Sequence, residues 1–434
     1  MRSSSIFQLV ILGILAASFV AAALIFSGLI PGLKGTGPEA GGTVVMWGTL
    51  PAQQLTPLVE EFNRTNRPIF LIYIEKNART FDRELVETLA SGGGPDLILM
   101  SDELIYRHAD KVYPISYEAF SQRDYLNTFV QESELYLISI GTLAMPLTLD
   151  PMVMYWNRDL FSSAGVPEPP KTWEQILSLG PKLTKKDSGG NLLQSGIAFG
   201  EFDNVEHAKD IVALLAMQAG NKIVERKEGG FQSVLALQTG FALRSTDEAV
   251  RYYTNFSNPV QPVYSWDKSQ PSSRDTFLSG RLALYFGYAS ELVNMRNQNP
   301  HLNFDVAPVP QTNGSAAAIT IGRMNGVAIL KASRNPTLAF NTIKLLSAPD
   351  FSLNLAKALL LPPPRRDLLR AKPNDAFMSV FFDSALISRG WVDPMPEETN
   401  RIFKELVENV VSGRLRIGEA VMGADAELAK LFSS

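Results

Sequence analysis

Three short apolar runs, TVVMW (residues 43–47), IFLIYI (69–74) and LILM (97–100), follow one another in the first quarter of the chain. Each run has the length and composition typical of a buried strand. Between the runs, apolar residues recur at spacings of three and four, which places them on one face of a helix. These helical positions are Leu55, Leu58, Val59 and Phe62, and then Phe81, Leu85 and Leu89. The alternation of strands and helices predicts a parallel sheet with helices on its faces.

A glycine-rich segment, SGGGPD (91–96), precedes the third run. A phosphate-binding loop follows a strand, precedes a helix and usually carries a Lys-Ser or Lys-Thr pair. This segment has the opposite order and no lysine. We therefore interpret it as the turn that ends the helix beginning at Phe81.

The remainder of the chain continues the α/β pattern. Thr172 can cap a helix, and Gln175, three residues later, can reach back to complete a capping box. Further elements are expected as strands at 196–199, 302–309 and 326–330, a helix end and a strand within 277–286, a helix at 336–346, and two helices within 400–432 separated by Ser412-Gly413.

The composition excludes several classes of protein. The chain has 434 residues, 45% hydrophobic and 19% charged, as expected for a globular protein of two or three domains. The formal net charge is −4 and no block of Lys or Arg occurs, so we expect no nucleic-acid partner. The absence of cysteine excludes disulfides, thiolate metal sites and a lipid-modified N-terminal cysteine. With three histidines far apart in the sequence, we expect no metal site and no cofactor.

The N-terminal segment is a long uncharged run. Ile6–Ile30 would reach roughly 37 Å as a helix, enough to cross a hydrocarbon core of about 30 Å. A secretory signal cleaved near Ala21–Ala23 or Ser27–Gly28 is the alternative, although its apolar region is usually only about 7–15 residues long. We therefore expect residues 1–30 to form a transmembrane anchor, followed by a Gly/Pro-rich linker at 31–42 and an extracytoplasmic body. Cleavage would instead release a secreted or periplasmic protein.

Catalytic motifs are missing from the sequence. It contains no nucleophile elbow, HExxH motif, phosphate loop or dinucleotide fingerprint. The adjacent Tyr252 and Tyr253 could supply phenolate ligands to ferric ion, but they follow a helical pattern and are better interpreted as packing residues. We expect a protein that is not an enzyme.

Five segments match, in order, the pattern of one known family. They are EFNRTN (61–66), LASGGGPDLI (89–98), DPMVMYWNRD (150–159) with PPKTW (169–173), FLSGRLAL (277–284), and FDVAPVP (304–310) with the helix break at 411–413. Over essentially all of residues 43–434, the chain resembles the extracellular solute-binding proteins of ABC importers, of the maltose-binding-protein type and its sugar-binding branch.

The resemblance implies an α/β fold of two lobes joined by hinge crossovers, the type II periplasmic-binding-protein-like fold. The implied crossings lie near residues 145–150, 303–308 and 347–351. The implied lobes are 43–146 with 305–348, and 151–303 with 352–434.

A sugar site needs aromatic platforms for C–H-rich faces and polar side chains for hydroxyl groups. Trp47 ends the first strand and Asp102 follows the third, and the carboxyl ends of parallel strands border the ligand crevice of open sheets. Core packing of Trp47 and a helix-capping role for Asp102 are alternatives of equal weight.

The resemblance adds further candidates for ligand contact. Asp150 lies at the implied hinge, where the family places an acidic contact. The other candidates from the resemblance are Glu201, Phe202 and Asp203 in one loop, Tyr288 where the family carries a stacking tryptophan, and Trp391 before the penultimate helix. Trp266 is a weaker candidate, because a polar loop surrounds it. Arg323 could face an anion such as a sugar phosphate, although a surface or lobe-bridging salt bridge is the favoured interpretation.

These features predict the extracytoplasmic substrate-binding component of an ABC transporter. It would act as a monomer that captures a mono- or oligosaccharide between its lobes and delivers it to permease subunits. The alternatives are a sensory or adhesive ectodomain with the same fold, and an importer subunit for a polyamine or a sugar phosphate.

Overall fold

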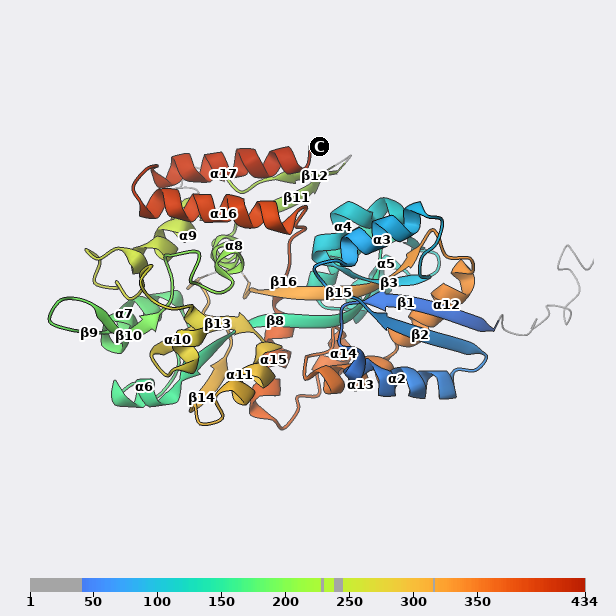
Figure 1. Cartoon of the computed structure of the whole chain (residues 1–434), viewed down its shortest axis with the longest axis horizontal. Coiled ribbons are helices and arrows are strands. Elements are labelled where there is room, and N and C mark those ends of the chain that lie inside the picture. The colour runs from blue at the N-terminus through green and yellow to red at the C-terminus, as the bar shows by residue number, and fades with distance from the viewer. Residues whose placement is uncertain (1–40, 228–229, 238–244, 315–316, 434) are drawn as a thin grey trace, which may run out of the picture.

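The computed structural model describes residues 41–227, 230–237, 245–314 and 317–433. These residues form two α/β lobes with two long strands between them (Figure 1). The expected anchor at 1–30 and nearly all of the linker lie outside the described residues. Within the described ranges, no helix is long and apolar enough to cross a membrane.

The first lobe is built on the three predicted strands. β1 (Gly42–Gly48) pairs in parallel with β2 (Ile69–Glu75) on one side and with β3 (Leu97–Ser101) on the other. The connecting helices are α2 (Ala52–Thr65) and α3 (Phe81–Ala90), which bury part of their predicted apolar faces. The parallel sheet predicted from residues 43–100 is therefore confirmed.

Two long antiparallel strands, β8 (Met145–Asn157) and β15 (Thr320–Leu330), join the lobes. One end of β15 pairs with β3 in the first lobe, and one end of β8 pairs with β13 (Leu282–Tyr288) in the second. The strand order β2-β1-β3-β15-β8-β13-β10-β9 is therefore continuous from one lobe to the other. We call β8 and β15 the hinge strands.

Further elements complete each lobe. The first contains α4 (Asp102–His108), β4 (Val112–Tyr113), β5 (Ile115–Ser116), α5 (Gln122–Thr128), the 3-10 helix η2 (Gln131–Tyr136), β6 (Leu137–Ile138), β7 (Gly141–Thr142), α12 (Pro336–Leu346) and α13 (Pro349–Leu359). The second contains α6 (Arg158–Ser163), α7 (Trp173–Leu183), β9 (Lys185–Lys186), β10 (Leu192–Ile197), α8 (Ala208–Gln218), β11 (Val224–Lys227), β12 (Gly230–Ser233), α9 (Ser245–Thr254), α10 (Ser273–Leu278), α11 (Glu291–Gln298), β14 (Phe304–Ala307), α16 (Pro396–Val411) and α17 (Ile417–Leu431). Between them run α14 (Arg366–Leu369), α15 (Ala376–Leu386) and β16 (Ser388–Arg389).

The lobe boundaries differ from those implied by the resemblance. β14 pairs with the second-lobe end of β8, and its Val306 and Ala307 belong to the second-lobe core. The second crossing therefore lies within β15 and not near residues 303–308. In addition, Leu355 of α13 lies in the first-lobe core, so the next crossing comes later than residues 347–351. An apolar segment in the sequence does not reveal which strand it will pair with, and tertiary pairing decided both positions.

Two local predictions are confirmed. Thr172 and Gln175 form the capping box at the start of α7. The pair Tyr252 and Tyr253 lies in α9, where the Tyr253 ring is fully buried and its hydroxyl donates to the Glu201 carbonyl at 2.6 Å.

Gly322 in the hinge strand β15 has no room for a side chain. A Cβ there would come within 2.1 Å of Ser388 Oγ and 2.2 Å of Glu132 Oε2. Because overpacking forces neighbours to shift, we expect Gly322→Ala to lower the free energy of unfolding by about 1–3 kcal/mol, measured by urea denaturation. Gly423→Ala in α17, where nothing lies near the added carbon, is the control and should be neutral or stabilising by up to about 1 kcal/mol. Equal losses in both variants would contradict this account.

Candidate functional site

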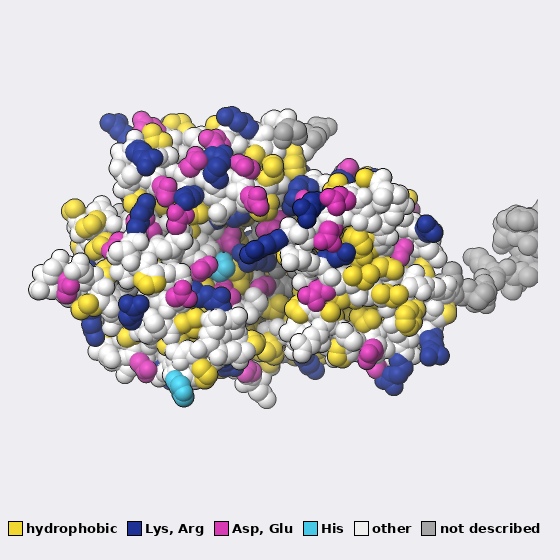
Figure 2. Space-filling model, viewed as in Figure 1, with side chains coloured by type: hydrophobic (Ala, Val, Ile, Leu, Met, Phe, Trp, Pro, Cys, Tyr) yellow, Lys and Arg dark blue, Asp and Glu magenta, His cyan; other side chains and the backbone are white. Residues whose placement is uncertain are grey.

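The two lobes border a cleft over the hinge strands. The space-filling view shows a hollow between the lobes, with acidic and basic side chains at its rim (Figure 2). A space of about 50 Å³ within it, which we call the cleft floor, has a lining that includes Asp102, Lys209, Asp210, Tyr288, Arg323, Trp391 and Asp393. These residues come from both lobes and from β15, so the cleft floor lies where the lobes meet.

An arginine, an aspartate and a tyrosine fill one side of the cleft floor. Arg323 Nη2 donates to Asp210 Oδ2 at 2.9 Å, and the Tyr288 hydroxyl donates to the same oxygen at 2.7 Å. The Arg323 guanidinium also lies 3.8 Å over the Tyr288 ring. Burial alone would raise the pKa of Asp210, but Arg323 and Lys209 hold that pKa below its ordinary value. The Tyr288 ring therefore supports Arg323 and is not an open stacking platform in this structure.

A buried ion pair fills the other side. Lys209 Nζ lies 2.7 Å from Asp393 Oδ2, and the Thr399 hydroxyl also contacts the Asp393 carboxylate. Burial would lower the pKa of Lys209, but Asp393 and Asp210 raise it above its ordinary value, so the lysine stays charged. The pair ties α8 to the segment that precedes α16, and the Lys209 ammonium faces the Trp391 ring at 5.8 Å.

Two carboxyl groups where the lobes meet have spare hydrogen-bonding capacity, Asp102 in the lining of the cleft floor and Asp150 on the hinge strand β8, outside that lining. Asp102 is the first residue of α4, and among the described residues it forms no ion pair and caps no helix. Burial raises the pKa of Asp102 well above its ordinary value. Asp150, on β8 opposite Arg323, accepts the Ser290 N–H at 2.9 Å, and burial raises its pKa to about 6. Both groups can bind hydroxyl groups of a ligand as acceptors or, when protonated, as donors.

Other predicted residues lie at the mouth of the cleft. Phe202 and Asp203 line a wider basin of about 460 Å³, together with His207 and Arg323. The Asp203 carboxylate forms an exposed ion pair with Lys404. Glu201 is buried beside the basin, 3.9 Å from Lys268 Nζ, and burial raises its pKa to about 6.

Two predicted tryptophans lie away from these spaces. Trp266 is fully buried, and its Nε1 donates to Asn204 Oδ1 at 3.0 Å, so the polar loop around it folds over a core residue. Trp47 is half-buried at the end of β1, and Lys76 Nζ lies 3.8 Å over its ring. Neither ring lines the cleft floor or the basin.

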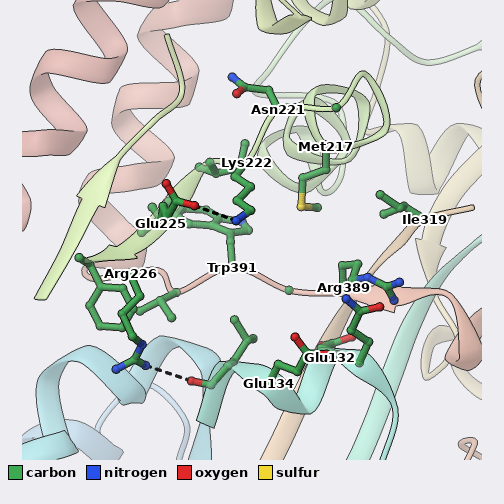
Figure 3. Close-up of a pocket in the computed structure, with 18 residues that line it drawn as sticks. Glu132, Glu134, Met217, Asn221, Lys222, Glu225, Arg226, Ile319, Arg389 and Trp391 are labelled. Carbon is green, nitrogen blue, oxygen red and sulfur yellow. Dashed lines mark hydrogen bonds and ion pairs between the residues drawn. The ribbon is translucent and has the colours of Figure 1, made fainter. Parts of the chain in front are cut away.

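A larger space lies beside Trp391. This half-open space of about 520 Å³, which we call the inner cavity, is lined by η2 of the first lobe, by α8 and β11 of the second, and by residues 389–392 (Figure 3). It shares Gly390 and Trp391 with the cleft floor. Trp391 therefore lines both spaces, and it is the predicted aromatic residue best placed to contact a ligand.

Sequence reasoning missed the charged partners that fill the cleft floor. Lys209 and Asp210 stand side by side at the start of the otherwise apolar segment IVALLAM, a pattern that could have marked them. Asp393 follows Trp391 by two positions. Their pairing with each other and with Arg323 depends on three segments far apart in the chain, so only the fold reveals it.

Residues 54–350 match the model of the bacterial extracellular solute-binding protein family. The chain therefore belongs to this family, and the resemblance inferred from the sequence is confirmed. A putative binding protein of Brucella abortus is 22% identical over 230 residues, or 52% of this chain and 51% of that protein. The chain thus spans about half the length of the curated relatives it matches.

Solved structures share the fold at low identity. The cyclic alpha-maltosyl-1,6-maltose binding protein from Arthrobacter globiformis superposes with a TM-score of 0.74 at 14% identity, covering 90% of this chain and 99% of that one. The sugar-binding protein MalE from Xanthomonas citri gives a TM-score of 0.71 at 19% identity, with coverages of 90% and 97%. These similarities establish the two-lobed α/β solute-binding fold.

Proposed function

We propose that this chain is the extracytoplasmic substrate-binding component of an ABC transporter, which captures a carbohydrate in the interlobe cleft and delivers it to a permease. The observation that carries the proposal is the position of Trp391, Asp102 and Asp150 at the junction of two lobes joined by hinge strands, in a member of a solute-binding family. The names of the structural neighbours, which bind maltose-type sugars, support carbohydrate as the ligand class.

Capture would follow from hinge closure. A ligand that contacts both lobes at once stabilises the closed form over the open one. Trp391 offers an apolar aromatic surface for a sugar ring, while the carboxyl groups of Asp102 and Asp150 can bind its hydroxyls. Residues 1–30 would tether the protein to the membrane, and the ligand would leave unaltered, since we infer no catalytic role for this site.

A ligand screen tests the function. A compound present at 100 times its dissociation constant should add roughly 2.7 kcal/mol to the free energy of unfolding of the purified protein. We expect mono- or oligosaccharides to raise the melting temperature. If a polyamine or a metal does so and no sugar does, the carbohydrate assignment is wrong. Turnover of a bound compound would contradict the assignment as a binding protein.

Asp150 is expected to contribute directly to binding. We expect Asp150→Ala to weaken the affinity for the sugar found in the screen by about tenfold or more, as for the loss of a hydrogen bond to a charged group. Isothermal titration calorimetry measures the affinity, and circular dichroism checks that the fold is intact. Asp350→Ala, an exposed position in α13, is the control and should leave affinity unchanged. Unchanged affinity of Asp150→Ala would remove this residue from the site.

A further inference from the structure

Two arginines at the inner cavity have no acidic partner. Among the described residues, neither Arg226 nor Arg389 forms an ion pair, whereas Lys209 and Arg323 at the cleft floor both do. Within the described part of the chain, Arg389 Nη1 donates to the Ser388 carbonyl at 2.7 Å. Arg226 Nη2 donates weakly to the Leu135 carbonyl, at 3.4 Å (Figure 3). Most of their N–H groups are therefore available to another acceptor.

Arg389 is half-buried at the inner cavity, whereas Arg226 is exposed. Burial lowers the pKa of both Arg389 and Arg226. The Arg226 guanidinium also lies 4.4 Å over the Phe231 ring, a contact that favours its charged form. An arginine remains charged at any physiological pH, so it cannot relieve this cost by losing a proton. A bound anion would supply the missing counter-charge.

The acidic residues of the inner cavity supply this counter-charge only in part. Glu225 is paired with Lys222 at 2.8 Å, at the rim. Burial raises the pKa of Glu132 to about 8, against the opposing effect of the Ser388 hydroxyl, so this group is mainly uncharged at neutral pH. Its Oε1 is buried and has no hydrogen-bond partner in the described part of the chain. Glu134 is exposed and forms no ion pair there, although its charge offsets part of the effect of burial on Arg389. The unpaired charge at the cavity is therefore mainly positive.

The volume and lining of the inner cavity suit a ring-shaped organic molecule. Its volume of about 520 Å³ falls within the range of roughly 300–1,000 Å³ typical of ligand sites, whereas the cleft floor, at about 50 Å³, does not. Trp391, Phe231, Met217 and Ile223 give it apolar walls. Aromatic walls with cationic groups beside them can hold the C–H face and the charged group of one ligand.

We propose that the inner cavity is a subsite for an acidic sugar, a ring bearing a carboxylate or phosphate group that Arg389, assisted by Arg226, recognises. The proposal rests on the proposed function and names the ligand class of the same interlobe site. Because the inner cavity and the cleft floor share Trp391, the remainder of a longer saccharide would extend past this indole toward Asp102.

Matched neutral and acidic sugars test the proposal. Calorimetry on the purified protein would compare glucose with glucuronate and glucose 6-phosphate, galactose with galacturonate, and inorganic phosphate alone. We expect at least one acidic sugar to bind about tenfold or more tightly than its neutral counterpart, with a preference that weakens at high salt. Arg389→Gln should remove this preference and Arg389→Lys should retain part of it. Arg251→Gln, on the outer face of α9, is the control and should change nothing.

Several outcomes would overturn the proposal. It is wrong if neutral sugars bind as tightly as their acidic counterparts, if no acidic sugar binds, or if Arg389→Gln and Arg226→Gln both keep the preference. Binding of inorganic phosphate that no sugar displaces would indicate an ion site instead. If neutral sugars bind as tightly as acidic ones, the acidic-sugar proposal fails but the proposed function stands. If only a polyamine or a metal binds, the proposed function fails as well.

Discussion

Replacing Asp393 with asparagine is expected to lower the free energy of unfolding by about 3–5 kcal/mol, because it leaves Lys209 as a buried charge without its partner. The two side chains are 5% and 15% exposed, so solvent screens their 2.7 Å contact only weakly. Asp210, beside the lysine, will compensate for part of the loss. Urea denaturation monitored by circular dichroism gives the change, provided that the slope of unfolding free energy against urea is unaltered.

A surface ion pair in the same lobe provides the control. Asp203 pairs with Lys404, but these side chains are 67% and 37% exposed. Exposed pairs contribute about 0–1 kcal/mol, so Asp203→Asn should change the stability by no more than that. If Asp393→Asn costs no more than Asp203→Asn, the pair between α8 and the segment before α16 does not stabilise the cleft floor.

Truncating Trp391 is expected to weaken ligand binding by about 30-fold or more, because this indole lines both the cleft floor and the inner cavity. Loss of a central aromatic contact typically costs 2 kcal/mol or more, and each 1.4 kcal/mol corresponds to about tenfold in affinity. We expect Trp391→Phe, which retains a ring, to bind more tightly than Trp391→Ala. Calorimetry with the sugar identified in the screen measures both.

The same truncation will also reduce stability, since Trp391 is 6% exposed and packs against Phe403. Phe277→Ala separates the two effects, because Phe277 is fully buried in the same core and lines neither the cleft floor, the basin nor the inner cavity. This control should destabilise the protein and leave affinity unchanged at temperatures where it is folded. If both variants lose affinity alike, Trp391 acts through stability and not through contact.

Local sequence patterns predicted the elements well. The runs at 43–47, 69–74 and 97–100 form β1, β2 and β3, and the Thr172 capping box begins α7, because both depend on residues a few positions apart. The pairing of β14 with β8 was not predictable in this way. It joins segments almost 150 residues apart, and the apolar pattern of β14 would suit either lobe.

The candidate site was predicted only in part, for a related reason. Three predicted residues do line the cleft floor, namely Asp102, Tyr288 and Trp391. Asp102 follows a strand, Tyr288 ends a strand and Trp391 precedes a helix, and the family resemblance implied where these elements lie in the fold. Trp266 was a ligand candidate because a polar loop surrounds it, but its side chain is fully buried and donates to the half-buried Asn204. Local polarity does not determine which way one side chain in a loop points.

The sequence by itself determined the strand and helix pattern of the first lobe and, through ordered motifs, the family. These properties depend on short-range periodicity, which is set by the geometry of strands and helices. Only the tertiary structure decided that Arg323 pairs with Asp210, that Lys209 pairs with Asp393, and that Arg389 is left without an acidic partner among the described residues. Charge pairing depends on distances of a few ångströms between distant segments, and the folded chain alone sets those distances.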